Sequence, residues 1–277
     1  MKKINSNIPM RSAGFAAMLM VTAPAMAQTT LFFDDFNGPT VNSAWQASMP
    51  NFNEAATAES ASYLGAPNYS FQTLGGYSVL NMNDTMSDLQ RRGLMTSTVF
   101  NAPGFIYQAR FNTLTQSQTT SIDAFLELSV FSAVNHNLYD TASPYEGGYA
   151  SNPQFAVGSS IDSTYGGQSF TFLNNTWYNL VINALPGQDI QVVLENDSGT
   201  PLISQTLNHT ASVYSSGFQI GLSQALGNPH GTYPTDVDVD YIKLTAVPEP
   251  GSVALAFTGL ALLLGTAKKR GVLRRCS

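Results

Sequence analysis

The chain has 277 residues, with 18 acidic and 12 basic side chains and a formal net charge of −6. Only four basic residues lie between residues 28 and 247, namely Arg91, Arg92, Arg110 and Lys243. This middle segment is therefore strongly acidic, which repels phosphate backbones and excludes a nucleic-acid partner. The single cysteine, Cys276, leaves no pair for a disulfide, so packing or a metal must hold the middle segment together.

The first 27 residues have the pattern of a secretory signal peptide. Basic residues occur only within the first 11 positions, and an uncharged stretch over residues 12–27 follows. That stretch ends with small residues at Ala25 and Ala27, which is typical of a cleavage site directly before Gln28. The sequence therefore predicts that residues 1–27 are removed on export.

The middle segment, residues 28–246, has the pattern of one all-β domain. Stretches rich in β-branched and aromatic residues recur throughout it, and Gly, Pro, Asn and Asp separate them. The expected strands are 31–36, 77–82, 94–100, 105–112, 122–132, 155–159, 169–173, 178–184, 190–195, 202–207, 218–222 and 237–245. Many short strands with such turns predict a jelly-roll β-sandwich.

Two polar stretches, residues 46–70 and 133–153, are expected to be long loops. The second contains Tyr139, Tyr145 and Tyr149 among Asn, Asp and Gly residues. Aromatic rings can stack on the apolar face of a sugar, while amides and carboxylates bind its hydroxyl groups. These three tyrosines are therefore candidate glycan-binding residues, although packing of the loop on its own domain stays an open alternative.

Three segments of the middle domain resemble concanavalin A-like lectin and glucanase sandwiches. They are the opening stretch 31–38 followed by Trp45, the stretch 176–182, and the closing stretch 237–244. The resemblance implies a sandwich whose first and last strands lie close together. Trp45 and Trp177 adjoin apolar strand patterns and are expected in the core.

The last strand carries Asp236, Asp238 and Asp240, which alternate along it and should share one face. The concanavalin A-like resemblance implies a structural calcium between the first and last strands, with Asp34 or Asp35 and Asp240 as ligands. A solvated acidic sheet edge, which discourages association between edges, is the alternative.

A glucanase of this fold would need two acids close together on one strand, and the nearest pair here is Asp123 and Glu127. Four residues of strand separate these carboxylates by about 13 Å. Either hydrolytic geometry needs about 5 to 9.5 Å. We therefore expect no catalytic residues and a non-enzymatic protein, and glycoside hydrolysis is the weakest alternative.

The C-terminal residues 247–277 form three consecutive parts. The first is Val247-Pro248-Glu249-Pro250, whose prolines disfavour helix and keep the chain extended. An uncharged run over 251–267 follows, and as a helix it would rise about 25 Å, enough to span a thin bilayer. The last part, 268–277, contains five basic residues, which are Lys268, Lys269, Arg270, Arg274 and Arg275. Such a tail is expected in the cytoplasm.

This order of motif, apolar run and basic tail resembles the PEP-CTERM sorting signal of Gram-negative, biofilm-forming bacteria. The resemblance implies that exosortase, a membrane enzyme, processes the chain near the motif at residues 247–250. It also implies transient anchoring in the inner membrane and delivery to the cell surface or extracellular matrix. An ordinary C-terminal membrane anchor is the alternative.

Together these patterns predict an exported, non-catalytic protein of the cell surface or of a biofilm matrix rich in exopolysaccharide. A glycan-binding, lectin-like module is the main alternative function. The expected partners are exosortase, the inner membrane and a glycan, and the one candidate cofactor is calcium.

Overall fold

The computed structural model describes residues 28–38, 42–46, 69–84, 91–115, 123–146, 153–226 and 235–249. The predicted signal peptide with Ala25 and Ala27 lies outside these ranges, as do Pro250, the apolar run and the five basic residues of the tail. In the ranges described, no helix is long and apolar enough to cross a membrane.

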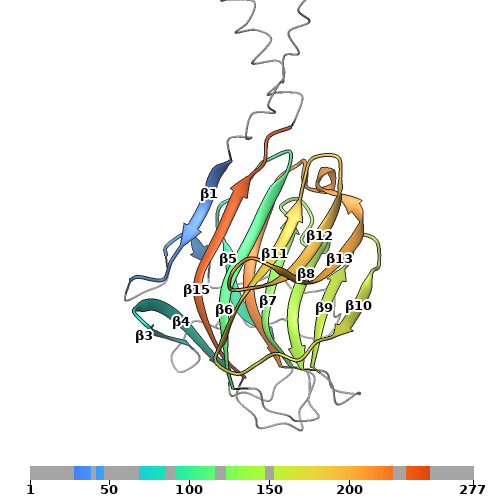
Figure 1. The fold of residues 1–277 in the computed structure, drawn as a ribbon. Helices are drawn as coiled ribbons and strands as arrows, with labels where there is room; N and C mark the ends of the chain where they lie inside the picture. The colour runs from blue at the N-terminus through green and yellow to red at the C-terminus, as the bar shows by residue number, and fades with distance from the viewer. Residues whose placement is uncertain are drawn as a thin grey trace, which may run out of the picture.

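Two antiparallel sheets make up the described part of the molecule (Figure 1). Sheet A runs in the order β13 (Pro201–Thr210), β12 (Asp189–Asn196), β11 (Thr176–Ala184), β6 (Phe105–Thr115), β15 (Thr235–Ala246), β4 (Tyr77–Asp84) and β3 (Tyr69–Leu74), and β1 (Thr29–Asp34) also pairs with β15. Sheet B runs in the order β10 (Tyr165–Ser169), β9 (Pro153–Ser159), β8 (Tyr139–Glu146), β7 (Asp123–Ser132), β14 (Phe218–Leu226), β5 (Arg91–Thr96) and β2 (Trp45–Gln46). A short 3-10 helix, η1 (Ala211–Tyr214), follows β13.

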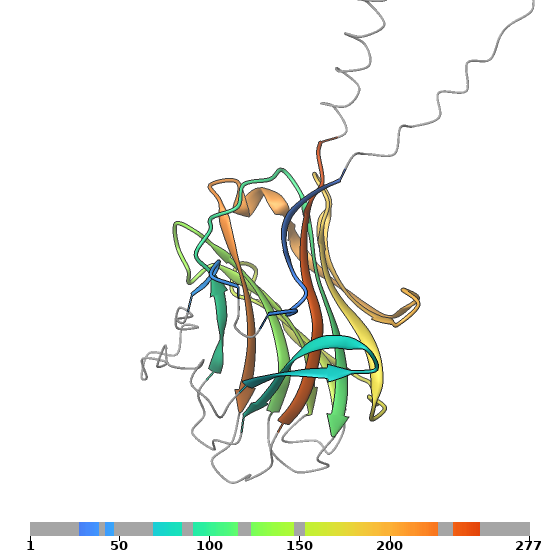
Figure 2. The ribbon, with the colours of Figure 1, turned by 90° about the vertical axis from the view of Figure 1, so that its left-hand side faces the viewer.

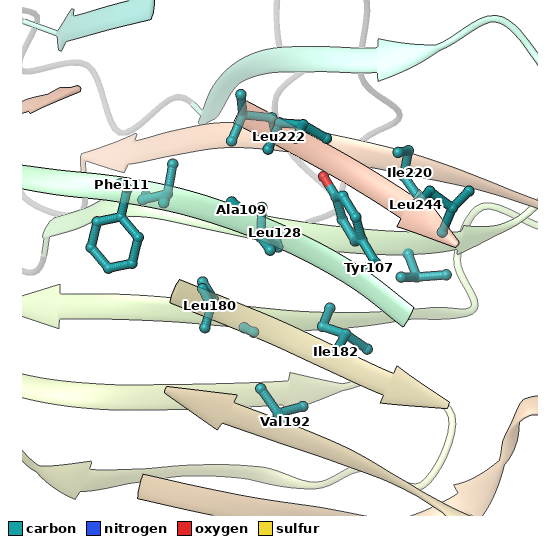
Figure 3. Close-up of a cluster of buried hydrophobic side chains, with 14 of the residues drawn as sticks. Tyr107, Ala109, Phe111, Leu128, Leu180, Ile182, Val192, Ile220, Leu222 and Leu244 are labelled. Atoms are coloured by element: carbon teal, nitrogen blue, oxygen red, sulfur yellow. The ribbon is translucent and has the colours of Figure 1, made fainter. Parts of the chain in front are cut away.

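The core lies between the two sheets, because alternate residues of each strand point inward. Figure 3 shows Tyr107, Ala109 and Phe111 of β6 among aliphatic side chains of both sheets. The Tyr107 hydroxyl is completely buried and donates a hydrogen bond of 2.7 Å to the carbonyl of Gly221 on β14. This bond joins sheet A to sheet B, and burial raises the pKa of Tyr107 well above its ordinary value.

Strand β15 has two partners along one edge. Its first half pairs with β4, from Thr235 to Val239, and its second half pairs with β1, from Ile242 to Ala246. The β3–β4 hairpin leaves the sheet where this change occurs and runs across the strands of sheet A (Figure 2). The start of β1 and the end of β15 therefore lie side by side at one end of the sandwich.

The predicted all-β jelly roll is confirmed, but the prediction was wrong for two segments of the chain. The stretch 133–153 was expected to be a loop, whereas residues 139–146 form β8 in the interior of sheet B. The expected strand at 169–173 lies earlier in the chain, as β10. Strands β2 and β3 were not predicted.

Candidate functional site

The outer face of sheet A carries a cationic side chain that packs against two aromatic rings. The guanidinium of Arg110 lies 4.2 Å from the ring centroid of Trp177 and 5.1 Å from that of Tyr77. It also forms ion pairs of 2.8 Å with Asp197 and 2.6 Å with Asp240. Burial by itself lowers the pKa of Arg110, but hydrogen bonds and charges from the two aspartates outweigh it and raise the pKa. Arg110 is therefore a fixed cation whose charge is already balanced.

A second aromatic pair lies on the same face, at the edge where β1 meets β15. Phe33 is 49% exposed, and its ring centroid is 6.1 Å from that of Tyr241. The Tyr241 hydroxyl accepts a hydrogen bond of 3.0 Å from the side-chain amide of Gln108. Gln108 also donates to the side chain of Asn179 over 3.3 Å. Amide groups thus lie between the two aromatic pairs. We call Phe33, Tyr241, Arg110, Trp177 and Tyr77 the outer aromatic surface.

Two local features of the backbone position this surface. Gly75 and Gly76 form the turn of the β3–β4 hairpin with φ angles of +59° and +93°, which residues with a Cβ rarely adopt. The turn places Tyr77, 50% exposed, against Trp177, with ring centroids 6.4 Å apart. In β15, Asp240 is an extra residue relative to β6, since Val239 pairs with Phe111 and Tyr241 with Arg110. Because of this bulge, Tyr241 lies opposite Arg110 in the register, while Asp240 still forms its ion pair with Arg110.

The candidate calcium ligands do not converge. Asp34 is buried and accepts hydrogen bonds from the Trp45 indole at 2.7 Å and from the backbone amide of Phe36 at 3.0 Å. Its register partner on β15 is Ile242, a core residue, whereas Asp240 binds Arg110 on the outer face. Asp35 bonds only locally to Asn37 among the contacts that we observe. These carboxylates therefore do not fit a shared calcium, and the described residues contain no group of three His, Cys, Asp or Glu side chains suited to a metal.

The candidate glycan-binding tyrosines have different positions. Tyr139 lies on β8 and is 7% exposed, in a small cluster with Met95 and Phe131, so its ring has little free surface for stacking. Tyr145 lies near the end of β8, where its backbone pairs with Gln154. Tyr149 lies outside the described residues.

The two tryptophans, both expected in the core, also differ. Trp45 is in the core as predicted, with a ring centroid 5.0 Å from that of Phe32. For Trp177 the prediction was wrong, because this residue is only partly buried and contacts Arg110 on the outer face of sheet A.

The outward face of sheet B carries a row of buried polar residues. Glu127 is 3% exposed and accepts hydrogen bonds from Ser129 at 3.3 Å and Ser223 at 3.5 Å. β7 has one extra residue between Ala124 and Glu127 relative to β14, because Glu127 pairs with Ser223 while Ala124 pairs with Ala225. The bulge reverses the alternation, so Ala124 rather than Asp123 is in register with the row that contains Glu127.

The start of the predicted sorting motif packs directly on the domain. Val247 is 5% exposed, and its backbone amide donates a hydrogen bond of 2.8 Å to the carbonyl of Gly104. Pro248 and Glu249 line a pocket of about 410 Å³ together with Thr29 and Pro103. The motif therefore begins at the surface of the sandwich, without a spacer after β15.

These features define a class of protein, the antiparallel jelly-roll β-sandwich. Within that class, the chain belongs to the family described as SO2946-like, C-terminal domain, which matches residues 94–240. Comparison with curated proteins finds no sequence match.

Solved structures agree with this fold. The CBM2 module of the Lactobacillus casei BL23 phage J-1 evolved Dit has a TM-score of 0.55 and 11% identity, covering 81% of this chain and 98% of its own. A structure from work on endo-acting O-glycanases of human gut microbiota, which initiate mucin breakdown, has a TM-score of 0.50 and 13% identity, covering 79% and 100%. Likeness at such low identity establishes the fold alone.

Sequence reasoning missed the outer aromatic surface, although it left signals. In the run Phe32-Phe33-Asp34, alternation requires that Phe33 face away from its neighbours, and both of these are buried. Tyr77 directly follows the paired glycines of a hairpin turn. The contacts of Arg110 with three residues of other strands and with Asp197, in the turn after β12, gave no local signal, because these partners are far apart in sequence.

Proposed function

We propose that this protein is a non-catalytic, glycan-binding component of the bacterial cell surface or extracellular matrix. The observation that carries this proposal is the outer aromatic surface, where half-exposed Phe33 and Tyr77 flank amide and carboxylate groups. Rings for the apolar faces of sugars, next to hydrogen-bonding groups for their hydroxyls, are the chemistry that glycan recognition needs.

The fold is compatible with glycan binding. The phage CBM2 module and the O-glycanases that act on mucin share the jelly-roll architecture of this chain. Fold alone does not assign an activity, so the proposal depends on the surface described above.

The absence of catalysis is supported by the register of β7. A glycosidase needs two carboxyl groups within about 5 to 9.5 Å of each other across the scissile bond. Glu127 lies in a polar row of sheet B, and the β7 bulge puts Ala124 opposite Ala225, so Ala124 and not Asp123 continues that row. The pairing of Asp123 with Leu226 separates it from that row.

Export and sorting form part of the proposal and depend on the two terminal sequence patterns. Processing by exosortase after transient anchoring in the inner membrane would release the domain to the surface or matrix. The arrangement of the sandwich is compatible with this route, because the start of β1 and the end of β15 lie side by side. A membrane at that end would leave the other faces of the domain accessible.

A glycan array with the full-length chain in mild detergent tests the function. We expect binding to at least one polysaccharide and no release of reducing sugar from it. Failure to bind any glycan would contradict the proposal. Release of reducing ends that disappears in Glu127→Gln would show instead that the protein is an enzyme.

Cell fractionation tests the destination. We expect the processed chain in the surface or matrix fraction, together with exopolysaccharide. An uncleaved chain that remains in the cytoplasm would disprove export.

A further inference from the structure

The two aromatic pairs of the outer aromatic surface together span four neighbouring strands. The outermost residues are Phe33 on β1 and Trp177 on β11, and β15 and β6 run between them. Neighbouring strands are about 4.8 Å apart, so three steps across the sheet separate Phe33 from Trp177 by at least about 14 Å. This length exceeds one sugar ring. A ligand that covers the whole surface from Phe33 to Trp177 must therefore be an extended chain.

One group between the two pairs is suited to hydroxyls, namely the partly buried side-chain amide of Gln108 on β6. This amide donates to Asn179 over 3.3 Å and to the Tyr241 hydroxyl over 3.0 Å, which holds it in a fixed orientation. Asn179 is 5% exposed, so it positions Gln108 and does not itself contact a ligand. Fixed donors and acceptors lose little conformational freedom when a ligand binds.

The charges on this face argue against an acidic ligand. Arg110 is engaged by Asp197 at 2.8 Å and by Asp240 at 2.6 Å, so its charge is already paired. Glu195 pairs in register with Asn179 on the same face, and burial raises its pKa. The only other described cation near the surface is Lys243, opposite Phe33. Carboxylates thus outnumber cations, and a polyuronate or sulfated chain would be repelled.

We infer that the outer aromatic surface binds a neutral polysaccharide chain laid across strands β1, β15, β6 and β11. Its sugar rings stack on Phe33 and Tyr241 at one end and on Tyr77 and Trp177 at the other. This inference rests on the proposed glycan-binding function and adds the charge, the length and the orientation of the ligand.

Calorimetry on the full-length chain tests the inference, with neutral oligosaccharides of increasing length prepared from the polysaccharide that binds best. We expect affinity to rise with length until both aromatic pairs are covered. Phe33→Ala and Tyr77→Ala should each weaken binding of the long chain about tenfold or more, as removal of a central aromatic contact usually does. An acidic polysaccharide should bind more weakly than the neutral one.

The matched control is Tyr165→Ala, which removes a 67% exposed tyrosine from β10 at the edge of sheet B. It should leave affinity unchanged, and unfolding curves should show that all three variants are folded. If the wild-type chain binds no polysaccharide, the proposed function fails. If it binds one while Phe33→Ala and Tyr77→Ala keep full affinity, or if it prefers an acidic chain, only the present inference is overturned.

Discussion

His209 joins the two sheets through a buried network of charged groups. Its Nε2 lies 2.9 Å from Asp140 of β8, and its Nδ1 lies 3.3 Å from Asp162. Asp140 is completely buried and also accepts a hydrogen bond of 2.7 Å from the Tyr214 hydroxyl. Burial by itself lowers the pKa of His209, but the two aspartates outweigh it and raise the pKa.

Replacement of this histidine should strongly destabilise the fold. In His209→Leu the carboxylate of Asp140 stays buried with one partner fewer, and breaking a buried ion pair in this way costs about 3–5 kcal/mol. Chemical unfolding in urea measures the loss. Asn208→Ala, at an exposed neighbouring position, is the control and should change stability far less. A loss below about 1 kcal/mol in His209→Leu would contradict the assigned role, because ordinary surface changes reach about half that value.

The same network predicts how stability depends on pH. The folded pKa of His209 is raised, so its contribution is complete below its ordinary value of 6.5 and is lost as pH rises through the folded pKa. Burial by itself raises the pKa of Asp162, but the hydrogen bonds that its carboxylate accepts have the larger effect. The pKa of Asp162 is therefore lowered to about 2. Its contribution is therefore lost as pH falls from its ordinary value of 3.8 towards 2.

We thus expect the free energy of unfolding to fall as pH rises above 6.5, and this fall should shrink in His209→Leu. Urea unfolding at a series of pH values provides the measurement. An identical pH profile in the variant would mean that His209 does not cause the dependence.

At the scale of elements, the β3–β4 hairpin and the β15 bulge together shape the outer face of sheet A. The hairpin contributes Tyr77, and the bulge contributes Asp240, and both contact Arg110 of β6. A buried bond of 2.8 Å from Asn81 of β4 to Asp238 of β15 ties the hairpin to the sheet. The site is thus assembled from strands that lie far apart in sequence.

The two ion pairs of Arg110 should differ in their effect. Asp240 has a side chain that is 13% exposed, whereas that of Asp197 is 54% exposed. Solvent screens an exposed pair, so Asp197→Asn should change stability by no more than about 0.5 kcal/mol. Asp240→Asn should cost more, about 1–3 kcal/mol, since it weakens a charged hydrogen bond in a largely buried place. Thermal unfolding of both variants gives the comparison, and equal losses would be inconsistent with this account.

At the scale of the whole molecule, packing between the sheets holds the described domain together. The chain has one cysteine, Cys276, and therefore no internal disulfide. The stacked rings of Phe105 and Phe218, 4.4 Å apart between centroids, join sheet A to sheet B at the end that also contains Tyr214. A closed apolar core of this kind is compatible with stability that needs no metal.

Removal of calcium should therefore leave the melting temperature unchanged. Asp34 is occupied by Trp45 and Asp240 by Arg110, on opposite faces of sheet A. Scanning calorimetry with EDTA and with added calcium is the measurement. A rise of several degrees with calcium would reveal a site that these residues do not account for.

The sequence by itself determined the fold class and most strands, because alternation of side chains and turn residues are local properties. The sequence did not predict β8, because the residues of this strand are largely polar. Asp140 is buried there only because it has partners on β13 and in η1, and Thr141 lies on the other face of the strand.

Only the tertiary structure decided which side chains meet. The bulge in β15 brought Tyr241 opposite Arg110, and the bulge in β7 took Asp123 out of the row that contains Glu127. A single inserted residue reverses the faces of all that follow, and its position depends on pairing between distant strands. The outer aromatic surface also depends on pairing between distant strands. Phe33 and Trp177 lie on one face only because of the order of the strands in sheet A.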